Sequence, residues 1–358
     1  MTMATTRGEL HDVLIMHRLI ALGYSNAVID QIVTLLEDSH KDVTARIAAR
    51  MAQGLSTNDL EQLRAELSTV IDIGYTRAFD QLQTELTAFA TVEAAASAEA
   101  LDRVIRVDRL KAKVPPANVL RTLIETEPFG DSDYFAPLAD WRRGVSDASQ
   151  KRLDSAIRKA FVEGQPLNTT LQAVRGTRRA KYRDGILYIS NRSAKRVVRT
   201  ALTHTSAQIR EATFQKNSAV VDYVEWSSTL DSRTSQQCAG LDGKRWRLGD
   251  KHPTPPAHPN CRSSIVPVTK TWRELGLDID EPIVARASYR GEVEAVDFDT
   301  FMREQPRSFT ESVFGKSKTK LLLDGQLPAS DMLDSNFKIR NLDQLKTLYA
   351  SAFEAAGL

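Results

Sequence analysis

The sequence predicts an α+β protein that is mostly α-helical, and two observations carry this prediction. Residues 1–112 place apolar side chains at 3- and 4-residue spacing, which is the period of an amphipathic helix. In the second half, Val220–Trp226 is a β-branched and aromatic run that is typical of a strand. We therefore expect long N-terminal helices followed by a helical domain with a small β-hairpin and a Pro-rich knot.

The composition is that of a globular protein. The chain has 358 residues, of which 42% are hydrophobic and 26% charged, and this length suits two or three domains. Its 48 Lys and Arg nearly balance 46 Asp and Glu, so the net charge of +2 excludes a uniformly basic nucleic-acid coat. No apolar segment approaches the ~20 residues of a membrane span, and we expect no stable transmembrane segment. Two cysteines are too few for a disulfide-built scaffold.

Glycines and capping residues divide the N-terminal region into expected helices. A first helix from about Gly8 to Leu22 should end at Gly23, and Ser25 should cap the next one. Gly54 is expected to end that second helix. Ser56-Thr-Asn-Asp59 then resembles a capping box and predicts the start of a further long helix.

The domain organisation follows from where the helical pattern is interrupted. The Ala-rich segment 94–100 is a strong helix former that fits an exposed or helix-packed rod. Prolines and glycines between residues 111 and 140 then predict a hinge. We expect an N-terminal α-helical domain at 1–112, a hinge or linker at 113–140, and a second domain at 141–350 that contains a knot motif at 228–268 and a helical tail at 296–350.

The second domain is expected to begin with helices and then to contain short strands. Helices are predicted at 140–164, 167–174 and 194–216. Asp242-Gly243 is a turn signal between two short extended pieces and predicts the hairpin. Ile265–Val268 is expected to be an edge strand, because Pro267 cannot donate a hydrogen bond at the centre of a sheet. In the tail, the expected helix stops are Gly315, Gly325 and Pro328.

The knot carries the residues most suited to binding a metal. His258-Pro-Asn-Cys261 places two soft ligands close together, and Cys238 lies upstream. With Asp231 or His252 as a fourth ligand, these residues have the composition of a zinc site. Two alternatives remain open from the sequence: a structural knot without metal, and a disulfide between Cys238 and Cys261.

A basic segment precedes the knot and is the candidate for contact with DNA. Between residues 175 and 199 there are nine Lys and Arg but one acid, Asp184. The basic residues are Arg175, Arg178, Arg179, Lys181, Arg183, Arg192, Lys195, Arg196 and Arg199. Such a density neutralises backbone phosphates without reading bases. The alternatives are a solvated face and a surface paired to an acidic protein.

Motifs of common enzymes are missing from the sequence, so we expect a protein that is not an enzyme. The chain has no phosphate-binding P-loop, no G-x-G-x-x-G, no G-x-S-x-G and no H-E-x-x-H. His204 and Ser206 are two residues apart on a predicted helix, so their side chains point to different sides.

The knot and its surroundings resemble a known family. Tyr223-Val-Glu-Trp226, Asp231-Ser-Arg-Thr234, Cys238-Ala-Gly-Leu-Asp-Gly243 and His258-Pro-Asn-Cys261-Arg262 follow one another in an order and at spacings that resemble the head-morphogenesis domain of tailed bacteriophages, the phage Mu F-type minor capsid family. Residues 298–331 are similar to the tail of that family. The resemblance covers about residues 145–345. Many members carry cysteines where this chain has Ser235 and Ser263, so a four-cysteine cluster is reduced here to two.

The resemblance implies a minor head protein in the capsid interior, present in the host cytoplasm during assembly. The implied partners are the portal protein, the major capsid protein and packaged double-stranded DNA. Several copies per virion are expected, and release with the genome during ejection is a further implication. Some relatives have a further C-terminal enzyme domain, which we do not expect in a chain that ends at Leu358.

Two other functions remain as alternatives. The first is a metal-dependent nuclease or hydrolase that uses Cys238, His258 and Cys261, with Asp231 as general base. The second is an ejection protein whose N-terminal amphipathic helices contact membrane.

Overall fold

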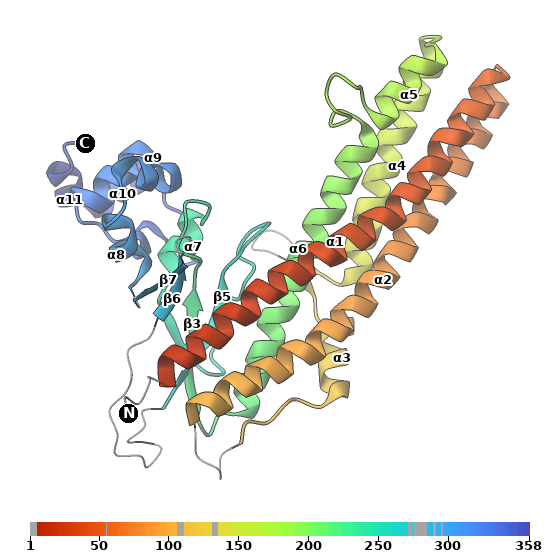
Figure 1. Cartoon of the computed structure of the whole chain (residues 1–358). Coiled ribbons are helices and arrows are strands. Elements are labelled where there is room, and N and C mark those ends of the chain that lie inside the picture. The colour runs from red at the N-terminus through yellow and green to blue at the C-terminus, as the bar shows by residue number, and fades with distance from the viewer. Residues whose placement is uncertain are drawn as a thin grey trace.

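The computed structural model describes residues 6–54, 56–105, 111–130, 135–270, 274, 285–288, 291–294 and 296–358. Helices account for 66% of the chain, and a small antiparallel sheet of three strands lies in the second half. The predicted class, α+β and mostly α, is confirmed. Figure 1 shows the long helices α1, α2, α4 and α6 forming an elongated bundle, with the sheet and the C-terminal helices at one side of it.

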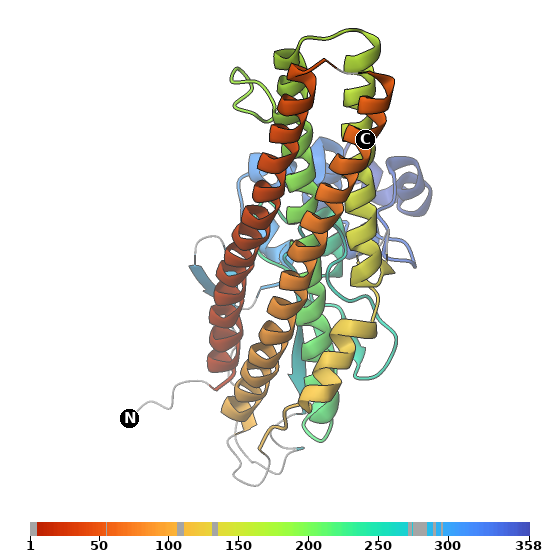
Figure 2. The same cartoon turned by 90° about the vertical axis from the view of Figure 1, so that its right-hand side faces the viewer.

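Two helices of unusual length form the N-terminal region. α1 (Thr6–Ala52) and α2 (Thr57–Ile105) run antiparallel along each other (Figures 1 and 2). The prediction that Gly23 ends a helix and Ser25 caps another was wrong, because α1 continues through both. A glycine costs a helix about 1 kcal/mol. Just beyond it, Val28, Ile29 and Ile32 are buried in the core shared with α2, and that burial outweighs the cost.

The turn between α1 and α2 has the predicted capping chemistry. Gly54 has a φ of +78°, a left-handed conformation that favours glycine. The Ser56 N–H donates to Asp59 Oδ2 at 3.0 Å, and the Asp59 N–H donates to Ser56 Oγ at 3.2 Å. These reciprocal bonds satisfy donors at the start of α2, so the predicted capping box is confirmed.

The helices on both sides of the expected hinge share one hydrophobic core. α4 (Leu138–Val162), α5 (Leu167–Arg175) and α6 (Ile186–Lys216) pack against α1 and α2. Residues 113–140 contain helix α3 (Ala117–Thr126) and the short paired strands β1 (Phe129–Gly130) and β2 (Phe135–Ala136). Leu120 and Ile124 of α3 are buried in the same core. The division into domains at 112 and 141 stays a prediction.

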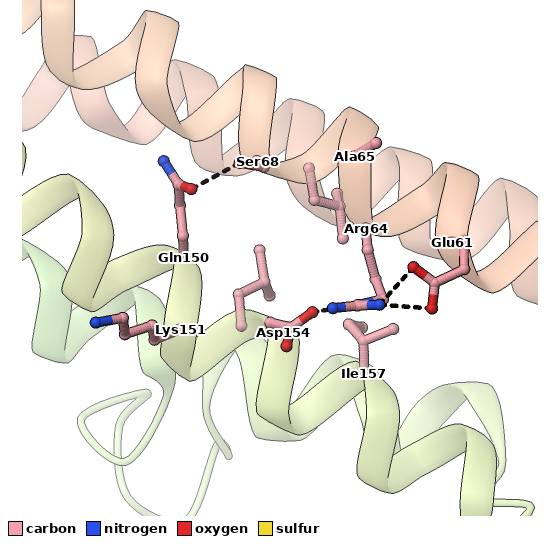
Figure 3. A pocket seen from close by; sticks show the side chains of 10 residues that line it. Glu61, Arg64, Ala65, Ser68, Gln150, Lys151, Asp154 and Ile157 are labelled. Atoms are coloured by element: carbon pink, nitrogen blue, oxygen red, sulfur yellow. Dashed lines mark hydrogen bonds and ion pairs between the residues drawn. The ribbon is translucent and has the colours of Figure 1, made fainter.

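Polar contacts set the alignment of α2 against α4. In Figure 3, Arg64 of α2 lies between Glu61, 2.6 Å away, and Asp154 of α4. Ser68 donates to the Gln150 side chain of α4 at 2.6 Å. A pocket of about 400 Å³ lies along this contact, with apolar side chains such as Ile157 in its wall. These contacts hold two helices in register and leave the core of the bundle apolar.

The Ala-rich segment of α2 is packed against other helices. Ala94, Ala98 and Ala100 are each no more than 4% exposed. Beside them, Glu93 of α2 pairs with Arg210 of α6. Of the two predicted environments, exposed or helix-packed, the structure has the second.

The sheet has strand order β4-β3-β5 and is antiparallel throughout. β3 (Val221–Ser227), the strand that was predicted at 220–226, lies between β4 (Arg245–Arg247) and β5 (Ser264–Thr269). Pro267 lies on the edge strand β5, opposite Val224, which confirms the prediction for 265–268. The hairpin prediction was partly wrong: Gly243, with a φ of +73°, follows helix α7 (Gln236–Leu241) and not a strand. The helix forms because Ser235 caps it.

The tail is helical and has a core of its own. It consists of α8 (Phe298–Arg303), α9 (Arg307–Leu323), a 3₁₀ helix (Ala329–Met332), α10 (Leu342–Leu348) and α11 (Ala350–Ala355). Gly315, with a φ of +72°, interrupts α9 as predicted. Before the tail, β6 (Ala285–Ser288) pairs with β7 (Gly291–Glu294). The tail packs on α7, which joins it to the knot (Figure 1).

Candidate metal centre and basic surface

The fold brings Cys238, His258 and Cys261 together from two segments. Cys238 is the third residue of α7, and its N–H donates to the capping Ser235 Oγ at 3.2 Å. His258 and Cys261 lie in a tight turn directly before β5, closed by the Cys261 N–H donating to the His258 carbonyl at 3.0 Å. Residue Asn260 in this turn has a φ of +61°. Since β3 pairs with both β4 and β5, the two segments meet at one end of the sheet.

The three side chains have the spacing that a tetrahedral ion requires. Cys238 Sγ lies 3.1 Å from His258 Nε2 and 3.7 Å from Cys261 Sγ. All three ligand atoms lie within 4.8 Å of one another. A tetrahedral zinc with Zn–S bonds of ~2.3 Å separates two sulfurs by about 3.8 Å. Both cysteines are free, whereas a disulfide needs sulfurs ~2.05 Å apart, so the structure does not contain the alternative bridge.

The protonation of the cluster also suits metal binding. The hydrogen bond between the thiols lowers the pKa of Cys261 and raises that of Cys238, because one thiol keeps its proton and donates it to the other. The His258 ring lowers the pKa of Cys261 further. His258 Nδ1 lies 3.0 Å from the Pro259 carbonyl, which can accept only if Nδ1 is protonated. That tautomer leaves the Nε2 lone pair free to face the sulfurs.

The predicted fourth ligands lie elsewhere. Asp231 accepts two hydrogen bonds from the Arg262 guanidinium, at 2.6 and 2.5 Å. Burial opposes ionisation of Asp231, but Arg262 outweighs it and holds the pKa of the carboxyl below its ordinary value. His252 stacks on Trp246 with ring centroids 5.5 Å apart, and its Nε2 lies 3.3 Å from Glu211. Among the described residues, the cluster therefore consists of Cys238, His258 and Cys261, without an Asp or Glu.

The two thiols of the cluster are buried, but Cys261 also lines a larger cavity of about 560 Å³. Cys238 and Cys261 are 2% and 5% exposed. The cavity beside Cys238 and His258 measures about 10 Å³, which is about the space of one water molecule. Ser235 and Ser263 both line this cavity. A zinc ion held by these three side chains would have an open fourth position, which is the ligand count of catalytic zinc sites, whereas the burial of both thiols is typical of structural ones.

The basic segment divides into two parts in the structure. We call residues 176–185, between α5 and α6, the basic loop. The loop is closed by Asp184, which accepts from the Thr177 N–H at 2.8 Å and from Thr177 Oγ1 at 2.7 Å. Gly185 is required for this closure, since an added Cβ would lie 2.3 Å from the carbonyl carbon of Arg175. The loop is thus a compact structure that presents Arg178, Arg179, Lys181 and Arg183.

The second part is a row of side chains along α6. Three positions separate residue 192 from 195 and residue 196 from 199, and four positions separate 192 from 196 and 195 from 199, which puts all four on one face of the helix. We call Arg192, Lys195, Arg196 and Arg199 the basic stripe. Eight of the nine predicted basic residues are exposed and Lys195 is half-buried.

The acids of the protein leave these cations unpaired. Within the described parts of the chain, none of the nine forms an ion pair with a carboxylate. Exposed arginines elsewhere do: Arg46 pairs with Asp42, and Arg307 with Asp324. The positive charge of the loop and the stripe is therefore available to an external anion.

Three arginines near the knot were not predicted as site residues. Arg262 holds Asp231, Arg233 lies beside it, and Arg210 crosses from α6 to β5, where it donates to Ser264 Oγ at 2.7 Å. Arg262 directly follows Cys261 in the sequence, which was a usable signal. The sequence carries no such signal for Arg210, because the residues that it contacts, Glu93 and Ser264, lie far from it in the chain.

Comparison with known proteins identifies a family for the central part of the chain. Residues 151–266 match the family described as phage Mu protein F like protein. This range contains the basic loop, the basic stripe and the cluster of Cys238, His258 and Cys261. No curated protein and no solved structure matches the chain. Within the described residues, no helix has the length and apolar character to cross a membrane. The resemblance expected from the sequence is thus confirmed for residues 151–266, which match a phage protein family, while the expected likeness of residues 298–331 to the family's tail lies outside the matched range.

Proposed function

We propose that this chain is a minor head protein of the capsid interior, which binds the portal or capsid and contacts packaged DNA through the basic loop and stripe. The observation that carries the proposal is the position of nine unpaired cations inside the segment that matches the Mu F family. A phage head contains double-stranded DNA at high density, and such cations bind its phosphates without reading sequence.

DNA binding is tested with matched variants. In the loop variant, Arg178, Arg179, Lys181 and Arg183 are changed to Ala. In the control variant, Lys41, Arg46, Arg158 and Arg307 are changed to Ala, which removes the same charge from exposed residues that are paired with acids. We expect the loop variant to bind duplex DNA at least tenfold more weakly at low salt, measured by fluorescence anisotropy, and the control to bind within about threefold of wild type. Equal losses in both variants would refute a specific basic surface.

Docking on the portal and capsid rests on the family relationship alone. The test is co-purification of the chain with the portal protein and with the major capsid protein of the same phage, followed by mass spectrometry of purified virions. Absence from virions would overturn the proposal as a whole.

We propose in addition that the chain is released with the genome. We expect the chain to be lost from particles that have ejected their DNA, and its retention in emptied heads would exclude release.

We propose further that the cluster of Cys238, His258 and Cys261 holds zinc as a structural clasp and that the protein acts by binding, not by catalysis. The burial of both thiols supports this, because it leaves little of the cluster exposed to a substrate. The bound ion would join α7 to the turn before β5. We expect about one zinc per chain by elemental analysis, lost in Cys238→Ser and Cys261→Ser. Nuclease activity that disappears in His258→Ala would overturn the binding-only interpretation.

A further inference from the structure

A second cavity, of about 560 Å³, lies between α1, α6 and the turn before β5. Its lining includes Ser25 and Asn26 of α1, Thr203 of α6 and Asn260 of the knot. We call it the arginine cavity, because four arginines line it: Arg199, Arg210, Arg233 and Arg262. It lies apart from the basic loop, since Arg199 is about 20 Å along α6 from the first residue of that helix.

The arginine cavity has an excess of positive charge. None of its lining residues, all of them in the described part of the chain, is Asp or Glu. Behind the lining, Glu93 neutralises Arg210 and Asp231 neutralises Arg262. Two guanidinium charges remain, those of Arg199 and Arg233.

The contacts of these two arginines leave their charges available. Arg199 Nη1 donates to the neutral Asn260 side-chain oxygen at 3.2 Å. Arg233 is 79% exposed, and its guanidinium reaches Asp231 at 3.5 Å, a carboxylate that Arg262 already holds by two shorter bonds. This excess of positive charge favours an anion with several negative charges, such as a polyphosphate.

The cavity is also preorganised. Arg262 is fixed by two hydrogen bonds to Asp231, and Arg210 by Glu93 and Ser264. Guanidinium groups that are already held in place lose little freedom when they bind an oxyanion, and their planar donor pairs match phosphate oxygens.

The remaining wall is apolar and comes from Phe89, Leu202 and Pro255. A volume of about 560 Å³ falls within the range of small-molecule sites, which is roughly 300–1,000 Å³. An inorganic ion alone would leave the apolar wall unfilled. We propose that the arginine cavity binds the phosphate of a nucleotide, with the base or sugar against the apolar wall.

Calorimetric titration of the full chain with ATP and with inorganic pyrophosphate tests this inference. We expect saturable binding of both at one site, tighter for ATP because of the apolar wall. The double variant Arg199→Ala, Arg233→Ala should weaken both at least tenfold. The matched double variant Arg46→Ala, Arg307→Ala removes the same charge from two exposed arginines outside the basic loop and the cavity, and should leave both affinities within twofold of wild type. Circular dichroism of each variant confirms that the helices are intact.

Three results would overturn the proposal. One is the lack of saturable binding of ATP and pyrophosphate at 50 mM salt. Another is an equal loss in the two double variants, which would reveal a general charge effect. A third is duplex DNA that displaces ATP and loses affinity in the single variant Arg233→Ala, since Arg233 is not part of the basic stripe and the cavity would then hold a DNA strand. Loss of DNA binding in the loop variant alone leaves the nucleotide site untouched, so this inference and the proposed function can fail separately.

Discussion

Glu93 and Arg210 join α2 to α6 as a buried ion pair whose side chains are 0% and 2% exposed. Ser206 donates to the same Glu93 oxygen at 3.1 Å, and Arg210 also donates to Ser264. Removing charges from water is costly, so such a pair is stable only while every partner is present. The Arg210 side chain therefore connects α2, α6 and the sheet.

Glu93→Gln should destabilise the protein strongly, because Arg210 would be left buried without a counter-charge. We expect a loss of about 3–5 kcal/mol in the free energy of unfolding, measured by urea denaturation. Glu66→Gln is the control: Glu66 pairs with Arg50, but both side chains are about a third exposed, and its loss should cost about 0–1 kcal/mol. Similar losses in the two variants would contradict the importance of burial.

His40 makes stability depend on pH. Burial lowers the pKa of His40 to about 4, from an ordinary value near 6.5. Between these pH values the unfolded chain binds a proton that the folded chain does not, so stability falls as the pH drops from about 6.5 towards 4.

His40→Leu should remove this contribution, which is about 3 kcal/mol when fully developed. Unfolding of wild type and variant at pH 7 and pH 4.5 measures it, and the difference between the two proteins cancels the other titrating groups. His204, whose pKa burial also lowers to about 4, keeps a similar dependence in the variant. A wild-type and variant difference that is the same at both pH values would exclude this role of His40.

α7, the Pro-rich turn and β5 form a unit in which short elements hold one another. The Cys238 carbonyl accepts a hydrogen bond from Ser228 Oγ at the end of β3, and Ser263 lies within hydrogen-bond reach of the Cys238 thiol. Ser235 and Ser263 line the small cavity beside Cys238 and His258. An ion held by the cluster would fix the ends of both segments.

Ser263→Cys should strengthen zinc binding, because it places a fourth soft ligand beside Cys238 with little change in volume. We expect at least a tenfold lower dissociation constant in competition with a chelator. Ser264→Cys is the matched control, since the Ser264 hydroxyl accepts from Arg210 instead. If both variants bind zinc as wild type does, Ser263 does not face the ion.

The whole molecule is nearly neutral, yet its charge is unevenly distributed. The net charge is +2, whereas nine cations and one acid occupy residues 175–199. The rest of the chain is therefore slightly acidic and repels DNA weakly, while one surface attracts it. Binding should then be local and strongly dependent on salt.

The affinity for duplex DNA should fall with salt in proportion to the number of phosphates that the protein neutralises. Neutralisation of four to nine phosphates predicts a slope of about −4 to −8 in a plot of log affinity against log salt. Anisotropy titrations between 50 and 200 mM NaCl measure this slope. In the loop variant, the slope should become shallower by about 0.9 for each phosphate that is no longer neutralised. A slope near zero for wild type would exclude phosphate binding by the loop and stripe.

Local chemistry explains which elements were predictable. The capping residues Ser56 and Asp59, the β-branched run of β3 and the edge position of Pro267 all follow from interactions within a few residues. The proximity of Cys238, His258 and Cys261 was predictable from their types and spacing. Gly23 misled the prediction, because its local cost is outweighed by packing against α2.

The amino-acid sequence alone determined the mostly helical class, the likeness to the Mu F family and the residues of the metal cluster, since these depend on local propensity and on motifs. Only the tertiary structure decided that Asp231 pairs with Arg262, that Glu93 pairs with Arg210, 117 positions away in the sequence, and that four arginines line one cavity. The physical reason is that burial and charge pairing are set by residues distant in the chain, which become neighbours only when the helices and the sheet pack.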